Sequence, residues 1–177
     1  GLEAAIHKAA NAGTLVFGVC GGYQMLGRTV SDPEQVEAAG TTEILGMGLL
    51  EMDTIFLGEK VQAQTTGVFA GISGVLSDLN GMSYSGYEIH MGRSEEEMPA
   101  LAGTGNVYGS YVHGVFDASG ISDTILKALC VRKGIDFDAL ETFDISEYKE
   151  HQYDLLADAV RSGLDMEFIY RILNREV

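Results

Sequence analysis

Short apolar runs alternate with polar, glycine-rich segments in the first part of the chain. Leu2, Ile6 and residues 9–10 recur at helical spacing, and residues 11–13 end that pattern. The apolar run 14–17 has the length of a buried strand, and a helix-compatible segment follows it directly. This order of helix, strand, tight turn and helix predicts an α/β fold whose parallel strands are buried under helices.

The middle of the chain has the alternating pattern of β-structure. A turn around residues 58–59 is expected to separate two strands, and the glycine- and serine-rich segment 67–81 is expected to be a loop with one short helical turn. The acidic run 95–99 is expected to be a solvated loop. The expected strands are 48–52, 60–65, 84–91 and 106–112.

The last third of the chain is predicted to be helical. A helix over 122–133 would place its apolar residues on one face, Cys130 among them, and end at Gly134. A second helix over 148–160 carries a stripe of apolar residues, and Asp165 is expected to cap a final helix that ends at residue 173. The stripe consists of Tyr153, Leu156 and Val160; the face of the first helix also holds Ile125, Leu126 and Leu129.

Composition indicates one globular domain over residues 1–177. The chain is 46% hydrophobic and 21% charged, and no apolar run approaches the roughly 20 residues that a membrane span needs. A net charge of -15 with only 11 Lys and Arg argues against binding to nucleic acid or to an anionic membrane surface.

Two cysteines are too few for a disulfide framework, so a cytoplasmic location is expected. Because the chain starts at Gly1 without an initiator Met, we expect a piece of a longer protein.

The segment from Gly18 to Gly22 contains the first candidate for chemistry. Its Gly-x-Cys-x-Gly pattern between a strand and a helix is typical of a nucleophile elbow, with Cys20 in the place of the usual serine. Glycines on either side would allow the chain to turn tightly and a substrate to approach. The N-terminus of the following helix would stabilise a thiolate, and the Gly21 N–H would be an oxyanion donor.

A cysteine nucleophile needs a base, and His113 at the end of a predicted strand is the first candidate. The carboxyl ends of neighbouring parallel strands lie at one edge of a sheet, so Cys20 and His113 could meet there and act through a thioester. His90 is a rival, because Glu88 lies two residues before it on the same face of a strand. His7 and His151 are expected on helix surfaces. No metal-binding motif is present, and no metal is expected.

Three segments, 18–27, 86–92 and 111–117, together with the C-terminal residues, resemble the class I (triad-type) glutamine amidotransferases. Within that class they are most similar to the glutaminase domains of cobyric acid synthases. The resemblance implies a flavodoxin-like α/β fold, with a mixed, mostly parallel sheet and helices on both faces. It also implies that strands of this sheet precede Gly1.

The resemblance assigns a role to each matching residue. Cys20 would attack the carboxamide of glutamine, and His113 would activate it and then protonate the departing ammonia. The oxyanion donor would be Gly21. Gln24 would line the glutamine pocket, and Glu88 and His90 would lie near the substrate or near the ammonia exit.

The resemblance further implies a synthetase domain outside these residues. That domain would activate corrinoid carboxylates with ATP and Mg²⁺, whereas this chain contains no phosphate-binding loop and is expected to hold no cofactor. The implied product is an amidated cobyrinate a,c-diamide. Alternatives are the glutaminase of a cobyrinate a,c-diamide synthase, that of a cell-wall amidating enzyme, or a catalytically silent binding module with the same fold.

Two departures from the family pattern affect the expected activity. Many triad amidotransferases have a glutamate two residues after the histidine, but this chain has Val115. The catalytic group would then be a dyad, unless Asp117 or another acid reaches the imidazole. The second oxyanion glycine of the class would lie before Gly1. We therefore expect the isolated chain to hydrolyse glutamine poorly or not at all.

Overall fold

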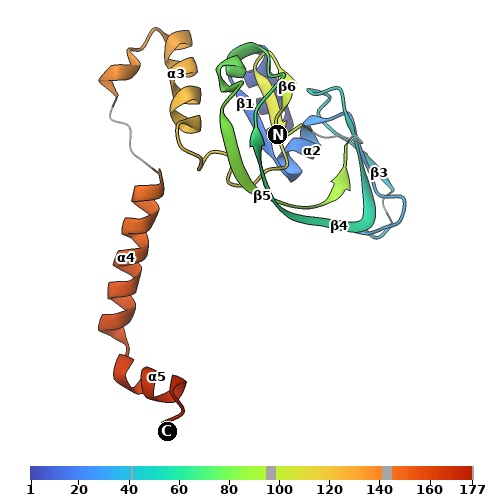
Figure 1. Cartoon of the computed structure of the whole chain (residues 1–177). Helices are drawn as coiled ribbons and strands as arrows, with labels where there is room; N and C mark the ends of the chain where they lie inside the picture. Colours follow the sequence, from blue (N-terminus) through green and yellow to red (C-terminus); the bar gives the residue numbers. More distant parts are fainter. Residues whose placement is uncertain (41, 95–98, 141–144, 177) are drawn as a thin grey trace. The chain divides into compact units, whose positions relative to one another are not determined.

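The computed structural model describes residues 1–40, 42–94, 99–140 and 145–176 (Figure 1). The chain forms two compact units, Gly1–Leu140 and Glu141–Val177. Most of the predicted acidic loop, residues 95–98, lies outside the described residues.

The first unit begins with the predicted order of helix, strand and helix. Helix α1 (Leu2–Asn11) is followed by β1 (Val16–Val19) and α2 (Gly21–Leu26). The strand starts two residues later than the apolar run predicts, because its pairing begins at Val16, which lies opposite Val107. Thr14 instead accepts a hydrogen bond at its carbonyl from the Asn106 side chain, at 2.7 Å.

A three-stranded sheet places two strand ends side by side. Strand β1 runs parallel to β7 (Val107–Ser110), and β7 pairs in antiparallel fashion with β6 (Ala102–Thr104). Val19, the last residue of β1, lies opposite Ser110, the last residue of β7. The residues that follow these two strands therefore emerge at the same edge of the sheet, as the sequence predicts.

A second sheet has four strands in the order β3-β2-β4-β5. Its members are β2 (Thr29–Ser31), β3 (Glu43–Leu45), β4 (Asp53–Val68) and β5 (Ser83–Arg93). The α/β class with mixed sheets is confirmed. In the described part of the chain two strand pairings are parallel and three are antiparallel, so the parallel share is smaller than predicted.

Strand β4 corrects the prediction of two separate strands. It is continuous from residue 53 to 68, and its pairing with β5 shifts between Phe56 and Val61, where the sequence indicated a turn. The apolar residues of 48–52 have another role: Leu50 and Met52 are buried in the core without belonging to a strand.

Two clusters of buried side chains form the core of the first unit. One surrounds Tyr108 and includes residues of the short 3-10 helix η1 (Gly74–Leu79), which confirms the predicted helical turn. The other surrounds Tyr23 of α2 and Tyr111, whose rings contact edge to face at 5.0 Å. Burial of each large apolar side chain contributes about 1.5–3 kcal/mol to stability. The second cluster thus anchors the turn between β1 and α2.

Helix α3 (Ile121–Lys133) is the predicted helix of the last third. It ends at Gly134, which has a left-handed backbone with φ of 66°, and Cys130 is buried as expected. Leu126 was predicted on the buried face, but 43% of it is exposed. A short 3-10 helix, η2 (Phe137–Ala139), ends the first unit.

The second unit consists of α4 (Ile145–Gly163) and α5 (Met166–Leu173). The carboxylate of Asp165 accepts a hydrogen bond from the Phe168 N–H at 2.9 Å, which confirms the predicted cap. The apolar stripe Tyr153, Leu156 and Val160 is exposed on α4. None of the helices in the described residues is both long enough and apolar enough to cross a membrane.

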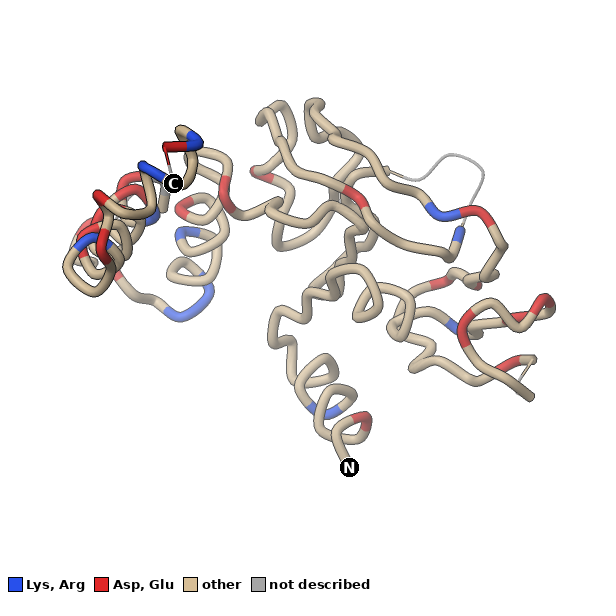
Figure 2. The backbone as a smooth tube through the Cα atoms, turned by 90° about the horizontal axis from the view of Figure 1, so that it is seen from below, with Lys and Arg blue, Asp and Glu red and all other residues tan. Residues whose placement is uncertain are grey.

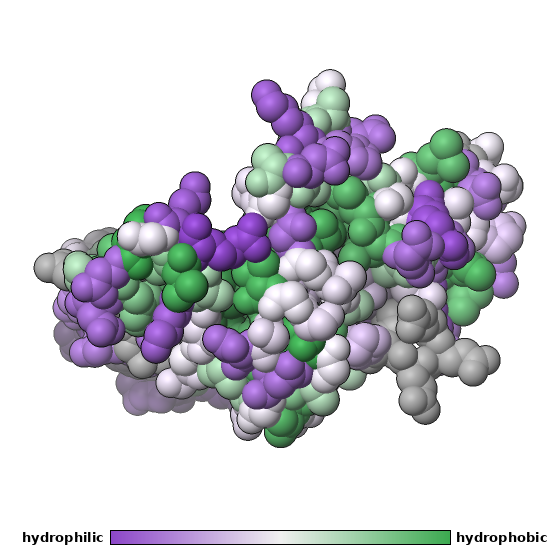
Figure 3. All heavy atoms as spheres, turned by 90° about the horizontal axis from the view of Figure 1, so that it is seen from above, coloured by the Kyte–Doolittle hydropathy of each residue, from purple (hydrophilic) through white to green (hydrophobic). Residues whose placement is uncertain are grey.

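Charges of both signs are spread along the described part of the backbone (Figure 2). In the whole sequence acidic residues outnumber basic ones, 26 to 11. On the face that Figure 3 shows, hydrophobic and hydrophilic side chains are interspersed.

Candidate active site

Cys20 lies in the turn between β1 and α2 in an unusual backbone conformation. Its φ of 52° and ψ of -113° are rarely adopted by a residue other than glycine, and such a conformation costs of the order of 1–3 kcal/mol. Two backbone hydrogen bonds hold it: its N–H donates to the Ser110 carbonyl at 2.8 Å, and its own carbonyl accepts from the Gln24 N–H at 3.0 Å. The structure therefore contains the predicted elbow.

Gly18 is the glycine that this turn requires. A Cβ at Gly18 would lie 2.7 Å from backbone atoms of Gly22 and Tyr23, so only glycine lets α2 fold back this closely onto β1. A Cβ at Gly21 or Gly22 would meet open space. The expectation that a glycine allows the chain to turn tightly is thus confirmed for Gly18, whereas the role of Gly21 and Gly22 in the approach of substrate stays a prediction.

The thiol of Cys20 borders a pocket of about 410 Å³. Its Sγ lies 3.6 Å from the carbonyl oxygen of Ile89 in β5, to which the thiol can donate. The pocket is lined by Cys20, Gly21, Gln24, Glu37, Phe56, Lys60, Ile89, His90 and Met91. The structure therefore brings together four of the residues singled out in the sequence: the cysteine, Gly21, Gln24 and His90.

His90 is buried in this site with both ring nitrogens engaged. Nδ1 lies 2.7 Å from the Gly92 carbonyl oxygen, and Nε2 lies 3.2 Å from a carboxylate oxygen of Glu88. The His90 side chain is 2% exposed and the Glu88 side chain is 25% exposed. The ring also stacks on Tyr111, with 3.9 Å between centroids. The predicted pairing of Glu88 with His90 is confirmed, although Glu88 lines a neighbouring pocket and not that of Cys20.

His113 follows β7 and is held against β5. Its N–H donates to the Tyr87 carbonyl at 2.8 Å, and its imidazole stacks on the Tyr87 ring at 5.1 Å. Gly86 makes this approach possible, because a Cβ there would lie 2.2 Å from the His113 carbonyl oxygen. The Nε2 atom of His113 is buried and forms no hydrogen bond with any described residue, Cys20 included.

The two histidines therefore differ in what they can do. His90 already uses both nitrogens, whereas Nε2 of His113 has no bond to give up before accepting a proton. Val115 is 2% exposed in the core, so the position two residues after His113 supplies packing and no carboxylate. Of the remaining histidines, His7 pairs with Glu3 on α1 at 3.9 Å and His151 is exposed on α4.

Comparison with known proteins agrees with this geometry. A sequence profile of the CobB/CobQ-like glutamine amidotransferase domain matches residues 1–121. The chain belongs to this family. Curated proteins named cobyric acid synthase match the whole chain at 47% identity in Lachnoclostridium phytofermentans, 43% in Ruminiclostridium cellulolyticum and 41% in Dehalococcoides mccartyi. This amidotransferase chain spans only 38–39% of the length of those relatives.

Two charged residues of the amidotransferase pocket, Glu37 and Lys60, are not indicated by any sequence motif. Glu37 belongs to the loop after β2, which Asp32 holds by accepting hydrogen bonds from the N–H groups of residues 36, 37 and 38 at 2.7, 2.9 and 3.0 Å. Burial of Asp32 acts to raise its pKa, but these N–H groups, that of Glu37 foremost, bring the pKa below its ordinary value. The Asp-Pro turn at residues 32–33 is the only local sequence pattern that indicates the loop carrying Glu37.

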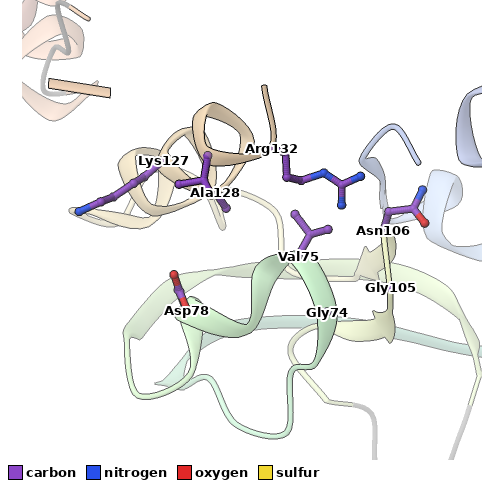
Figure 4. Close-up of a pocket in the computed structure, with 9 residues that line it drawn as sticks. Gly74, Val75, Asp78, Gly105, Asn106, Lys127, Ala128 and Arg132 are labelled. Carbon is purple, nitrogen blue, oxygen red and sulfur yellow. The ribbon is translucent and has the colours of Figure 1, made fainter. Parts of the chain in front are cut away.

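A larger pocket of about 600 Å³ lies elsewhere in this amidotransferase unit (Figure 4). Residues of η1, of the β6–β7 turn and of α3 line it, and it contains neither cysteine nor histidine. Arg132 extends toward Asn106 in this view, and its guanidinium donates to the Gly13 carbonyl at 2.6 Å. The pocket therefore lacks the thiol and imidazole that thioester chemistry would use. Within the described residues, no group of three or more His, Cys, Asp or Glu is placed to hold a metal ion.

Proposed function

We propose that this chain is the glutaminase domain of a cobyric acid synthase, with Cys20 as its nucleophile. The observation that carries the proposal is the strained backbone of Cys20, which presents a thiol to a pocket of about 410 Å³ in a chain of the glutamine amidotransferase family. A strained turn of this kind is typical of a nucleophile elbow. Glutamine is the substrate that family membership implies.

In the proposed reaction the Cys20 sulfur attacks the carboxamide carbon of glutamine while His113 takes the thiol proton. The tetrahedral oxyanion accepts a hydrogen bond from the Gly21 N–H, a contact worth roughly 10²- to 10³-fold in rate. Collapse of this intermediate breaks the C–N bond, and His113 returns the proton to the leaving ammonia. Water then cleaves the thioester to give glutamate and the free thiol.

The free Nε2 of His113 supports its role as base, since no existing hydrogen bond opposes its approach to the sulfur. His90 and Glu88 have a different part in the proposal. Their buried contact at 3.2 Å fixes the wall of the pocket next to Ile89, whose carbonyl faces the thiol. His90 and Gln24 line the pocket and orient the bound glutamine there, and Glu88 acts through its contact with His90.

The ammonia would then serve a synthetase domain beyond this chain. We propose that this domain uses ATP and Mg²⁺ to amidate carboxylates of cobyrinate a,c-diamide. The name cobyric acid synthase, carried by relatives of which this chain spans 38–39%, supports this assignment. An amidotransferase with a free catalytic thiol suits the reducing cytoplasm, where we place it.

The test uses the full-length protein and its amidation reaction with two nitrogen sources. Cys20→Ser should abolish amidation that depends on glutamine and leave amidation by free ammonia intact. Cys130→Ser is the matched control, because this second thiol is buried on α3, outside the pocket. Retention of glutamine-dependent amidation by Cys20→Ser would refute the proposal. Loss of both reactions would show that Cys20 has a structural role.

A further inference from the structure

The pocket of Cys20 contains two opposite charges that the reaction at the carboxamide does not need. Glu37 lies in the loop after β2, and Lys60 lies on β4, where its pairing with β5 shifts. No ion pair joins either side chain to another described residue. Thus one carboxylate and one ammonium are available to a ligand in a pocket that also contains the nucleophile.

Both charges belong to one connected wall of the pocket. Asp32 fixes the backbone at Glu37 through the N–H bond of 2.9 Å, and the carboxylate of Glu34 in the same loop accepts a bond from the Gly58 N–H of β4 at 3.3 Å. Gly58 is two residues from Lys60. The loop and the strand are therefore tied together next to the two charged side chains.

Free glutamine has matching charges at the end that does not react. Its α-ammonium and α-carboxylate share one carbon, which two methylene groups separate from the carboxamide. On the basis of the proposed function, we propose that Glu37 binds the α-ammonium and Lys60 the α-carboxylate. These two residues would make the site specific for the free amino acid, and it would reject glutamine whose amine or carboxylate is blocked, as in a peptide.

The test measures glutaminase kcat and KM of the full-length protein with three substrates: glutamine, Nα-acetylglutamine and glutamine α-amide. Removal of one charge-assisted hydrogen bond in a solvent-accessible pocket should raise KM for glutamine about tenfold and change kcat little, because such a bond is made equally in the ground and transition states. Lys60→Gln should show this increase and abolish the preference for glutamine over its α-amide. Glu37→Gln should abolish the preference for glutamine over the Nα-acetyl compound.

Two further variants separate specificity from misfolding. Lys60→Arg keeps the positive charge and should keep KM close to that of the wild type. Glu59→Gln changes the charge of the adjacent residue on β4, which pairs with Arg93 at 3.7 Å and does not line the pocket, and should leave KM unchanged. Increased salt should raise KM for the wild type more than for Lys60→Gln.

The outcomes distinguish this inference from the proposed function. If the wild type hydrolyses glutamine in a manner that requires Cys20, and Glu37→Gln and Lys60→Gln retain its KM and its substrate preferences, the charge assignment is wrong and the glutaminase assignment stands. If the wild type shows no hydrolysis that requires Cys20, both are wrong.

Discussion

The carbonyl oxygen of Ile89 lies 3.6 Å from the Cys20 sulfur, although 69 positions separate the two residues in the sequence. Two residues earlier on the same strand, Tyr87 pairs through its backbone with His113 and stacks on its ring. Strand β5 thus contacts both the proposed nucleophile and the proposed base. The neighbouring ends of β1 and β7 bring these two residues to one edge of the sheet, and β5 completes the site there.

Gly18→Ala should destabilise the protein, because the added Cβ would lie 2.7 Å from backbone atoms of α2 that cannot move independently. Overpacking of this kind typically costs about 1–3 kcal/mol. Gly22→Ala is the matched control: its Cβ meets open space in α2 and should not destabilise the protein. Urea unfolding of both variants measures the difference. Equal midpoints would show that close contact at Gly18 does not determine the geometry of the turn.

Replacement of the two histidines should have different kinetic effects. His113→Ala removes the proposed base and should lower kcat for glutamine hydrolysis by about 10²- to 10⁴-fold. His90→Gln removes a side chain that contacts Glu88 and Gly92, and should mainly raise KM because the pocket wall becomes less ordered. Steady-state kinetics of the full-length protein distinguishes these effects. A larger decrease of kcat in His90→Gln than in His113→Ala would make His90 the base.

Much of the local structure could be predicted from the sequence. The elbow around Cys20, the caps at Gly134 and Asp165 and the helix η1 each depend on residues close to one another in the chain, so short patterns are sufficient to indicate them. The pairing of Glu88 with His90 follows from strand periodicity alone.

Long-range contacts explain what the sequence could not show. The strands β2 and β3 have only three residues each, too few to show a strand period, and they are stabilised by pairing with partners elsewhere in the sheet. The prediction of a strand over 48–52 was wrong because core burial and strand pairing both select apolar residues. Glu37 and Lys60 reach the pocket through contacts between the β2 loop and β4, which no local pattern encodes.

Acid should destabilise the loop that carries Glu37, because this loop is held by hydrogen bonds to the carboxylate of Asp32. The pKa of Asp32 is lowered in the folded state, so its contribution to stability is fully present above its ordinary value near 3.8 and is lost as the pH falls through the lower, folded value. Asp32→Asn should therefore be less stable than the wild type at pH 7, and the difference should shrink below about pH 4. Urea midpoints measured between about pH 2.5 and 7 test this. A difference that stays constant with pH would contradict the role of the carboxylate.

The most direct test of the central claim identifies the atom that attacks glutamine. Full-length protein is treated with the glutamine analogue diazo-oxonorleucine, an electrophile that alkylates the nucleophile of glutaminases, and the modified peptide is located by mass spectrometry. We predict a single label on Cys20, none on the buried Cys130, protection by excess glutamine, and no labelling of Cys20→Ala. Labelling that persists in Cys20→Ala would contradict the assignment of Cys20 as the nucleophile.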